Sequence, residues 1–521
     1  MKSSNAEFIS AGSKTAYLLS LLIVGIPVLL AFISIALKNW GQIFDDAFIS
    51  YRYAQNLAMG YGLTWNPGYP PTEGYTNPLL VLMLAPVIWA GLDPLLFTRI
   101  SSIICVIAIS AILFNVARRR YHCSHLAAIM IAAIIFMFPA TAIICILGLE
   151  TVIYACLLLL TFIAGTNFID RQQLRGSIMF SCLLFLTMLL RPEAILLYPV
   201  ISAAALFTAV RHKTGLKPLL AGLLLLLAMG GAYLAWKYFH FGQLLPNPFY
   251  IKASGNTLIS PDGLQSVHEF INDYFPVLAF ALASLLLTVF AHRNMQRWNR
   301  IAVLAGSVFV VMYCLFFMHV DTLMDISGRF LYPLVPLIIL LAIPSFSRTM
   351  EFFESFSKYK IYVLPVLMLA FLFAFGGRGI FKIEDRINWL TSHQAAPARV
   401  TPMQKEYLIS KALARFPPIR EVRIAFADSG VMPYFSGAIW LDVVGLNDGF
   451  IAKSRSKKNL LDYFFIWSPD MVIHPGKFGM SWLRMGHGPL GDYLSWSNDP
   501  RWDEYEYVGT STLEGFPYDL Q

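Results

Sequence analysis

The stretch Phe44–Tyr53 reads FDDAFISYRY, and twenty residues later Glu73–Pro78 reads EGYTNP. The first stretch follows an apolar run, residues 16–37, that is long enough to cross a membrane. A carboxylate at bilayer depth costs about 2.5–3.5 kcal/mol on insertion scales, so Asp45 and Asp46 are expected at the membrane interface, facing a cavity. The pair therefore marks a candidate site at one surface of a membrane protein.

The composition of the whole chain indicates an integral membrane protein. Of its 521 residues, 57% are hydrophobic and only 13% are charged, against about 25% charged in soluble domains. The formal net charge is +8, but the basic residues gather in short runs between apolar segments and not among stacking aromatics. We therefore expect membrane lipids, and no nucleic acid, as partners. The six cysteines lie in or beside apolar segments without a CxxC pair, so they are predicted to be buried apolar residues.

Eleven apolar segments are predicted to span the membrane. The segment 78–91 is also apolar, but it is short and contains Pro86, so we expect a half-inserted or interfacial helix there. With that choice all the basic loops fall on one side, which the positive-inside rule assigns to the cytoplasm together with the N-terminus. The motifs described below then lie on the outer face. The predicted spans are residues 16–37, 95–117, 124–146, 151–168, 176–190, 194–210, 217–238, 276–291, 300–319, 332–346 and 361–377.

Residues 378–521 are predicted to form a second domain outside the membrane, because they hold 32 of the 70 charged residues and 6 of the 11 tryptophans. A capping box at Thr401-Pro402-x-Gln404 predicts a helix to about Phe416, and a second helix is expected over Lys457–Trp467. The predicted strands are residues 421–428, 438–444 and 471–474. The expected fold is thus a mostly α-helical polytopic membrane module over 1–377, with a first outer loop at 38–94, and an extracytoplasmic α/β domain.

The outer motifs carry a resemblance to a known family. The stretch DDAFISYRYAQNLAMGYGLTWNPG followed by TEGYTNPL resembles the first extracytoplasmic loop of the GT-C class of membrane glycosyltransferases. More narrowly, it resembles the family of the mycobacterial terminal β-(1→2)-arabinofuranosyltransferase. Phe249 departs from the pattern, which commonly has a tyrosine there. Further elements of that family are matched by GLET (Gly148–Thr151), RPE (Arg191–Glu193), LLPNPFYIK (Leu244–Lys252), SGRFLYP (Ser327–Pro333), and Asp428-Ser429-Gly430 with Pro433 and Tyr434.

The resemblance implies a GT-C fold with about 11 transmembrane helices and a catalytic acid residue on the first outer loop. It also implies transfer of a sugar, with arabinofuranosyl as one candidate, from a polyprenyl-phosphate sugar to a cell-envelope glycan or glycolipid. The reaction would take place on the extracytoplasmic face of the cytoplasmic (inner) membrane. No cofactor is expected beyond the lipid-linked donor, since nucleotide sugars are absent outside the cytoplasm and the sequence has no nucleotide-binding loop.

Three alternatives stay open. A GT-C enzyme for another sugar, such as mannose or an aminosugar, would have the same motifs. A lipid-linked-sugar flippase or transporter should place ionisable residues near the membrane midplane and contain repeats, whereas here they gather at the outer ends of spans. A non-enzymatic assembly or sensor protein would not need the DDAF loop.

Asp45 and Asp46 are the candidate catalytic residues. Adjacent residues on a helix point about 100° apart, so the two carboxylates are expected to do different jobs. Asp45 is predicted to act at the reaction centre as base or nucleophile, and Asp46 to position sugar hydroxyls. The alternative is that the pair only caps a helix that begins at Ala47.

The candidate substrate-binding residues come from the other outer motifs. Arg191, Lys252 and Arg329 are cations able to hold the donor phosphate, or to reach lipid headgroups. Glu150 and Glu193 are expected to pair with those arginines. The pair Asp45-Asp46 is not a DxD triplet and has no neighbouring ligand set, so no metal is predicted. The remaining candidates, which could contact substrate or serve helix packing and turns, are Tyr51, Arg52, Glu73, Tyr75, Asn77, Asn247, Tyr250 and Asp428.

Overall fold

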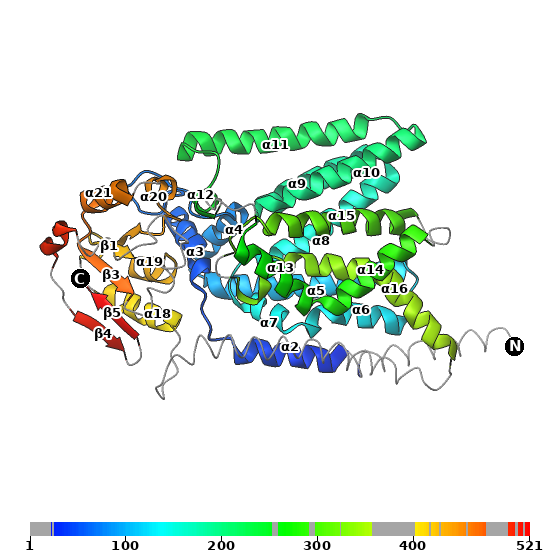
Figure 1. Cartoon of the computed structure of the whole chain (residues 1–521), viewed down its shortest axis with the longest axis horizontal. Helices are drawn as coiled ribbons and strands as arrows, with labels where there is room; N and C mark the ends of the chain where they lie inside the picture. The colour runs from blue at the N-terminus through cyan, green and yellow to red at the C-terminus, as the bar shows by residue number, and fades with distance from the viewer. Residues whose placement is uncertain are drawn as a thin grey trace.

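The computed structural model consists of a bundle of long helices with a smaller domain at one end (Figure 1). The two parts contact each other through helix α3 (Asp45–Ala58), the loop that follows it, and α12 (Asn247–Lys252), which packs against α20 (Gly449–Lys453). The residues that the structure describes are 22, 25–252, 259–290, 297–322, 325–356, 402–415, 418–426, 429–454, 457–475, 499–505, 509–513 and 516–520.

The bundle contains six helices long and apolar enough to cross a membrane, or up to eight if each bent pair counts as one span, among the described residues. Nine of the predicted spans coincide with helices or a bent pair, and α2 is the described part of the first. The segment 361–377 lies outside the described residues. The bundle helices are α2 (Ile26–Lys38), α4 (Pro78–Trp89), α5 (Pro94–Arg119), α6 (His125–Met137), α7 (Pro139–Ile146), α8 (Thr151–Arg171), α9 (Leu174–Met188), η2 (Pro192–Leu196), α10 (Leu197–His212), α11 (Lys217–Phe241), α14 (Phe275–Phe290), α15 (Arg297–Phe317), η5 (Tyr332–Leu334) and α16 (Val335–Phe356).

Local sequence explains several helix boundaries in the bundle. Helix α5 begins where Asp93 accepts hydrogen bonds from the backbone N–H groups of Leu95 and Leu96, with Pro94 at the first helical position. Helices α6 and α7 meet at a bend of 56° because Pro139 disfavours the helical conformation at Phe138. Helix α4 has 12 residues, so it is about 18 Å long and shorter than the hydrocarbon core, as expected for 78–91.

The bundle has a centre and a periphery. The apolar window of α16 is entirely buried by other helices, whereas only 11% of the corresponding window of α11 is buried. Helix α11 lies along one edge of the bundle, beside α9 (Figure 1). Exposed leucines such as Leu224 and Leu227 on α11 are suited to lipid contact.

The end of the bundle nearest the smaller domain carries short elements. They are α3, α12 (Asn247–Lys252), the amphipathic helix α13 (Pro261–Asp273) and the 3-10 turn η4 (Ile326–Gly328). Helix α13 is bent by 83° from α14, so only α14 continues into the bundle, as the predicted span 276–291 required.

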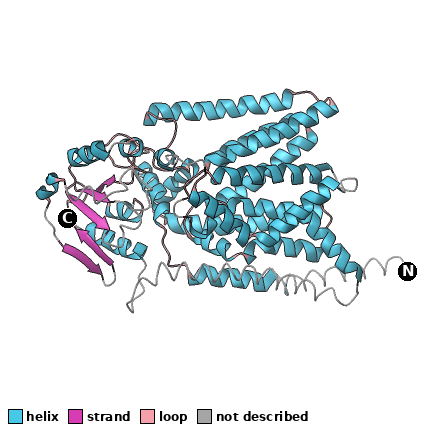
Figure 2. Cartoon of the chain, in the orientation of Figure 1, coloured by secondary structure: helices cyan, strands magenta, loops and turns pink. Residues whose placement is uncertain are grey.

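The C-terminal domain is a five-stranded mixed sheet with helices around it (Figure 2). The strand order is β2-β1-β3-β5-β4, with β1 (Arg423–Phe426) parallel to β2 (Ile439–Asp442) and to β3 (Met471–Pro475). Strand β5 (Phe516–Leu520) is antiparallel to β3 and to β4 (Gly509–Leu513). The helical elements are α18 (Pro402–Leu413), α19 (Val431–Ser436), α20 (Gly449–Lys453), α21 (Lys457–Trp467) and η8 (Pro500–Glu504).

This domain confirms the predicted α/β class. The three predicted strands correspond to β1, β2 and β3, and the helices that were expected from Pro402 and over Lys457–Trp467 are α18 and α21. Strands β4 and β5 were not predicted. The predicted domain boundary at residue 378 lies outside the described residues.

Candidate active site

Helix α3 carries both aspartates on its first turn. Its N-cap residue is Phe44, whose side chain cannot cap, and the helix begins at Asp45, two residues earlier than expected. Neither aspartate occupies the N-cap position, and both carboxylates bond to distant parts of the chain, so the alternative in which the pair only caps this helix is wrong. Two negative charges in the first turn are still favoured by the helix dipole.

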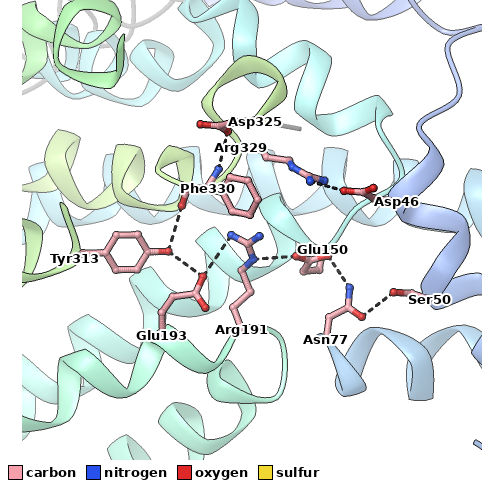
Figure 3. Close-up of polar contacts among 10 residues, drawn as sticks. All are labelled: Asp46, Ser50, Asn77, Glu150, Arg191, Glu193, Tyr313, Asp325, Arg329 and Phe330. Atoms are coloured by element: carbon pink, nitrogen blue, oxygen red, sulfur yellow. Dashed lines mark hydrogen bonds and ion pairs between the residues drawn. The ribbon is translucent and has the colours of Figure 1, made fainter. Parts of the chain in front are cut away.

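Asp46 points toward the bundle. Its Oδ2 accepts a hydrogen bond from Nη2 of Arg329 in a salt bridge (Figure 3). The Asp46 side chain is 27% exposed, whereas that of Arg329 is 5% exposed. The carboxylate is therefore within reach of a ligand, and the cation behind it is not free to move into water.

Arg329 is held by aromatic rings and by an unusual turn. Its guanidinium carbon lies 4.8 Å from the ring centroids of both Phe44 and Phe330. The preceding Ser327 and Gly328 adopt positive φ angles of 58° and 67°, the left-handed region that glycine tolerates best. The buried Nε of Arg329 has no hydrogen-bond partner among the residues that the structure describes. The side chain thus keeps one N–H donor for which the described part of the chain supplies no acceptor.

A second group of charges surrounds Arg191. Its Nε donates to Oε1 of Glu150 at 3.0 Å, and its Nη1 lies 3.4 Å from Oε1 of Glu193. Asn77 donates from Nδ2 to the other oxygen of Glu150 at 2.8 Å and accepts from the Ser50 hydroxyl at 2.7 Å. The expected pairing of both glutamates with an arginine is confirmed. The chain Ser50–Asn77–Glu150–Arg191 ties α3 to α4, α8 and η2 (Figure 3).

The two arginines meet at Phe330. The guanidinium carbon of Arg191 lies 5.0 Å from the centroid of the ring that Arg329 also contacts. Tyr313 donates to the Phe330 carbonyl at 3.3 Å and to Glu193 at 3.4 Å, which anchors this segment. Nη1 of Arg191 forms an ion pair with Glu193 but makes no hydrogen bond within the described ranges of the chain. Two buried cations with spare donors therefore gather beside the accessible carboxylate of Asp46.

Asp45 points the other way. Its Oδ1 accepts a hydrogen bond of 2.6 Å from the backbone N–H of Val431 in the C-terminal domain, and the residue is only 4% exposed. A Cβ atom added at Gly430 would lie 1.9 Å from the Asp45 carbonyl oxygen, so the two backbones are in direct contact. Of the two predicted catalytic carboxylates, geometry favours Asp46 as the one that a substrate can reach.

Tyr51, Arg52 and Tyr75 are occupied by protein contacts. The Tyr51 hydroxyl donates to the Gly148 carbonyl at 2.7 Å. Arg52 donates from Nε to the Trp65 carbonyl at 2.9 Å and bonds to the C-terminal domain. Tyr75 is 2% exposed, so burial leaves no surface for a ligand. These three predicted substrate contacts hold the first loop in place.

Glu73 and Asn247 lie in a separate polar cluster. Glu73 forms a 2.8 Å salt bridge with Lys237 of α11, and the backbone N–H of Asn247 donates to the Glu73 carbonyl at 2.9 Å. Burial raises the pKa of Glu73, and the charge of Lys237 opposes that rise. Sequence reasoning missed Lys237; the signal was a cation inside the apolar run 217–238.

The remaining predicted contacts are peripheral or undescribed. Tyr250 is half-buried, with Nζ of Lys453 lying 5.3 Å from its ring centroid. Lys252 ends helix α12, but its side chain lies outside the described residues, as does all of Asp428. No group of three or more His, Cys, Asp or Glu side chains is placed to hold a metal in the described part of the chain, and the lack of a metal requirement stays a prediction.

Comparison with solved structures shows the fold. ArnT from Cupriavidus metallidurans bound to undecaprenyl phosphate aligns with a TM-score of 0.58 and 11% identity, covering 94% of this chain and 97% of that chain. The apo state of the same protein aligns at 0.53 and 10% identity, covering 95% and 98%. A family model described as a domain of unknown function (DUF8728) matches residues 399–517. No curated protein matches in sequence. The chain is therefore a multi-pass membrane protein with the GT-C fold, as expected.

Proposed function

We propose that this chain is a membrane glycosyltransferase that moves a sugar from a polyprenyl-phosphate donor to an acceptor hydroxyl on the extracytoplasmic face. The observation that carries the proposal is the Asp46–Arg329 pair, an accessible carboxylate beside a buried cation with a spare donor. The fold adds support, because the ArnT structure that it resembles is described as bound to undecaprenyl phosphate.

The proposed reaction is a displacement at the anomeric carbon of the donor sugar. The acceptor oxygen forms a bond to that carbon, and the bond from the carbon to the phosphate oxygen breaks. The electron pair leaves with the polyprenyl phosphate, and the acceptor proton passes to the Asp46 carboxylate. The Asp46 side chain suits this step because it is partly exposed and fixed on the first turn of a helix.

Arg329 and Arg191 are the proposed holders of the donor phosphate. Without a donor, Arg329 is paired with Asp46, so Oδ2 of that carboxylate is occupied by the guanidinium. A phosphate oxygen that accepts from Arg329 competes with Asp46 for the same cation. Donor binding would therefore release the Asp46 carboxylate from Arg329 in the enzyme–donor complex, where it must accept a proton. The N–H groups of Arg329 and Arg191 that lack a hydrogen-bond partner among the described residues would then donate to the phosphate oxygens of the donor.

The proposal also names a sugar, an acceptor and a membrane. The first-loop motif favours arabinofuranosyl transfer to a cell-envelope glycan or glycolipid at the cytoplasmic (inner) membrane. Mannose and aminosugars are the competing donor sugars, since the contacts described around Asp46 involve phosphate-binding and proton-accepting groups and do not select among sugars.

The experiment is a transfer assay with the full-length protein in liposomes. Polyprenyl-phosphate arabinofuranose, mannose and an aminosugar would be supplied in turn with synthetic oligosaccharide acceptors, and products measured by mass spectrometry. We expect one donor to yield an acceptor one sugar longer together with free polyprenyl phosphate. Movement of an intact donor across the bilayer, with no bond cleaved for any of the three, would contradict the proposal and identify a transporter.

A further inference from the structure

The C-terminal domain is bonded to α3 by buried polar contacts. Beside the Asp45–Val431 hydrogen bond, Arg52 donates to the carbonyls of Pro433 and, at 2.8 Å, Ala438. All these contacts join α3 to helix α19 and the residues just after it. They come from the buried interior of the interface, where Asp45 and Arg52 are 4% and 3% exposed.

Aromatic rings fill the same interface. The Phe48 ring lies 5.3 Å from that of Tyr434 and 5.2 Å from that of Phe435. Asp45, Phe48 and Arg52 are spaced i, i+3 and i+7, so they form one stripe of α3. One face of helix α3 thus packs against the C-terminal domain.

The first loop is bonded to the same domain. Asn66 donates to the Trp440 carbonyl at 2.9 Å and accepts from the Trp440 N–H at 3.1 Å. The Thr72 hydroxyl donates to the Asn447 carbonyl at 3.0 Å, and a Cβ at Gly74 would lie 1.8 Å from the Asn447 side chain. Contacts this close allow little rotation or sliding of α3 against the domain.

This attachment matters for catalysis because Asp45 and Asp46 are adjacent on one helical turn. A rotation of α3 that separates Asp45 from Val431 also moves Asp46 relative to Arg329. A misplacement of about 1 Å in a reacting group can cost about 10²-fold in rate.

We infer that the C-terminal domain positions the active site: it holds α3 in the rotation that presents Asp46 to Arg329, and Asp45 is the positioning residue through which it does so. The inference rests on the proposed function, because it takes Asp46 as the reacting carboxylate. It gives a role to residues 429–440, within the segment matched by the domain model of unknown function.

The test compares Asp45→Ala with Asp45→Asn in the full-length protein. Alanine removes the acceptor for the Val431 N–H, whereas asparagine keeps one in Oδ1. We expect Asp45→Ala to speed hydrogen exchange at Val431 and to lower kcat by about 10²-fold with little change in donor KM. Asp45→Asn should restore slow exchange and most of kcat. The same inactivity in both variants, with exchange unchanged, would overturn the inference, because Asp45 would then act chemically.

A second variant approaches the interface from the other side. Gly430→Ala places a methyl group against the Asp45 carbonyl, so it should lower kcat while donor binding by the two arginines persists. Normal kcat in Gly430→Ala, or in Asp45→Ala, would overturn the positioning role. The exchange measurement needs no activity, and Asp46→Asn tests the proposed function separately: retained turnover there would refute the chemistry whatever the Asp45 variants do.

Discussion

The two faces of α3 differ in what they contact. The face toward the C-terminal domain, with Asp45, Phe48 and Arg52, is packed and hydrogen-bonded to protein. The face toward the bundle, with Asp46 and Ser50, meets a network of charges and remains partly open, since the Asp46 side chain is 27% exposed. Identical neighbouring residues thus acquire different roles from a rotation of about 100° between them.

The roles proposed for the two faces of α3 require that this helix lies outside the cytoplasm. With the six native cysteines replaced by alanine, a cysteine at Ile466, which is 80% exposed on the C-terminal domain, should react with an impermeant thiol reagent from outside. A cysteine at the exposed Arg119, at the other end of α5, should not. The effect should be all-or-none, and the reverse pattern of labelling would place the whole site in the cytoplasm. Ser429 is unsuitable for this experiment because it is only 4% exposed.

On the face of α3 toward the bundle, Asp46→Asn should reduce catalytic turnover and leave stability unchanged. Proton acceptance by a positioned group contributes about 10²–10⁴-fold, so turnover should fall by that factor, or about 3–5 kcal/mol in the barrier. The Tm in detergent should stay close to wild type, because the Asp46 side chain is partly exposed and asparagine still accepts from Arg329. A loss of Tm in proportion to the loss of activity would show that Asp46 is structural.

On the face of α3 toward the C-terminal domain, Arg52→Met should reduce the stability of the protein. This substitution removes the buried guanidinium donor of the Pro433 and Ala438 carbonyls and one of the two donors of the Trp65 carbonyl, which keeps its bond from Asn56. A cost of about 3–5 kcal/mol in stability is expected, measured by chemical or thermal unfolding. The control is Arg501→Met, which removes the surface ion pairs of Arg501 with Asp462 and Asp499 and should cost much less stability than Arg52→Met, because exposed ion pairs contribute little. Equal effects of the two substitutions would show that the interface contributes no special stability.

A smaller effect should come from the turn that contacts the first loop. Burial raises the pKa of Asp442 to about 6, although N–H groups of Val444, Gly445 and Asn447 favour its ionised form. The folded pKa of Asp442 lies above its unfolded value. The contribution of this carboxyl group to the unfolding free energy is therefore fully present below about pH 3.8 and is lost as pH rises through about 6. The unfolding free energy of wild type relative to Asp442→Asn should fall by about 2–3 kcal/mol across this window. Parallel pH profiles of Tm would contradict the assignment.

The sequence predicts much of this fold for simple physical reasons. Long apolar runs separated by basic loops place the bundle helices, and a change in composition together with the capping box at Pro402 places the C-terminal domain. Glu150, Glu193 and Arg191 were expected to pair because buried charges need partners. Strand β4 escaped prediction because its short polar stretch GTSTL lacks the apolar alternation of a half-buried strand, and β5, FPYDL, because a proline inside a short run argues against a strand.

The roles within the site were harder to predict. The rotation of α3 depends on where Val431 and Arg329 lie, and both are more than 280 residues away along the chain. The start of the helix at Asp45 could not be read from the sequence because Phe44 is a poor N-cap. Tyr51 and Arg52 have side chains typical of substrate contacts, yet tertiary packing uses all of their surface.

Binding of undecaprenyl phosphate tests most directly whether Asp46 and the donor phosphate share Arg329. Affinity would be measured in detergent for wild type, Asp46→Asn and Arg329→Gln, with Arg423→Gln, which breaks a more exposed ion pair with Asp470, as the matched control. We predict that Asp46→Asn binds more tightly than wild type because the competing anion is gone, even though its turnover is strongly reduced, and that Arg329→Gln binds more weakly. Weaker or unchanged binding by Asp46→Asn would contradict the account.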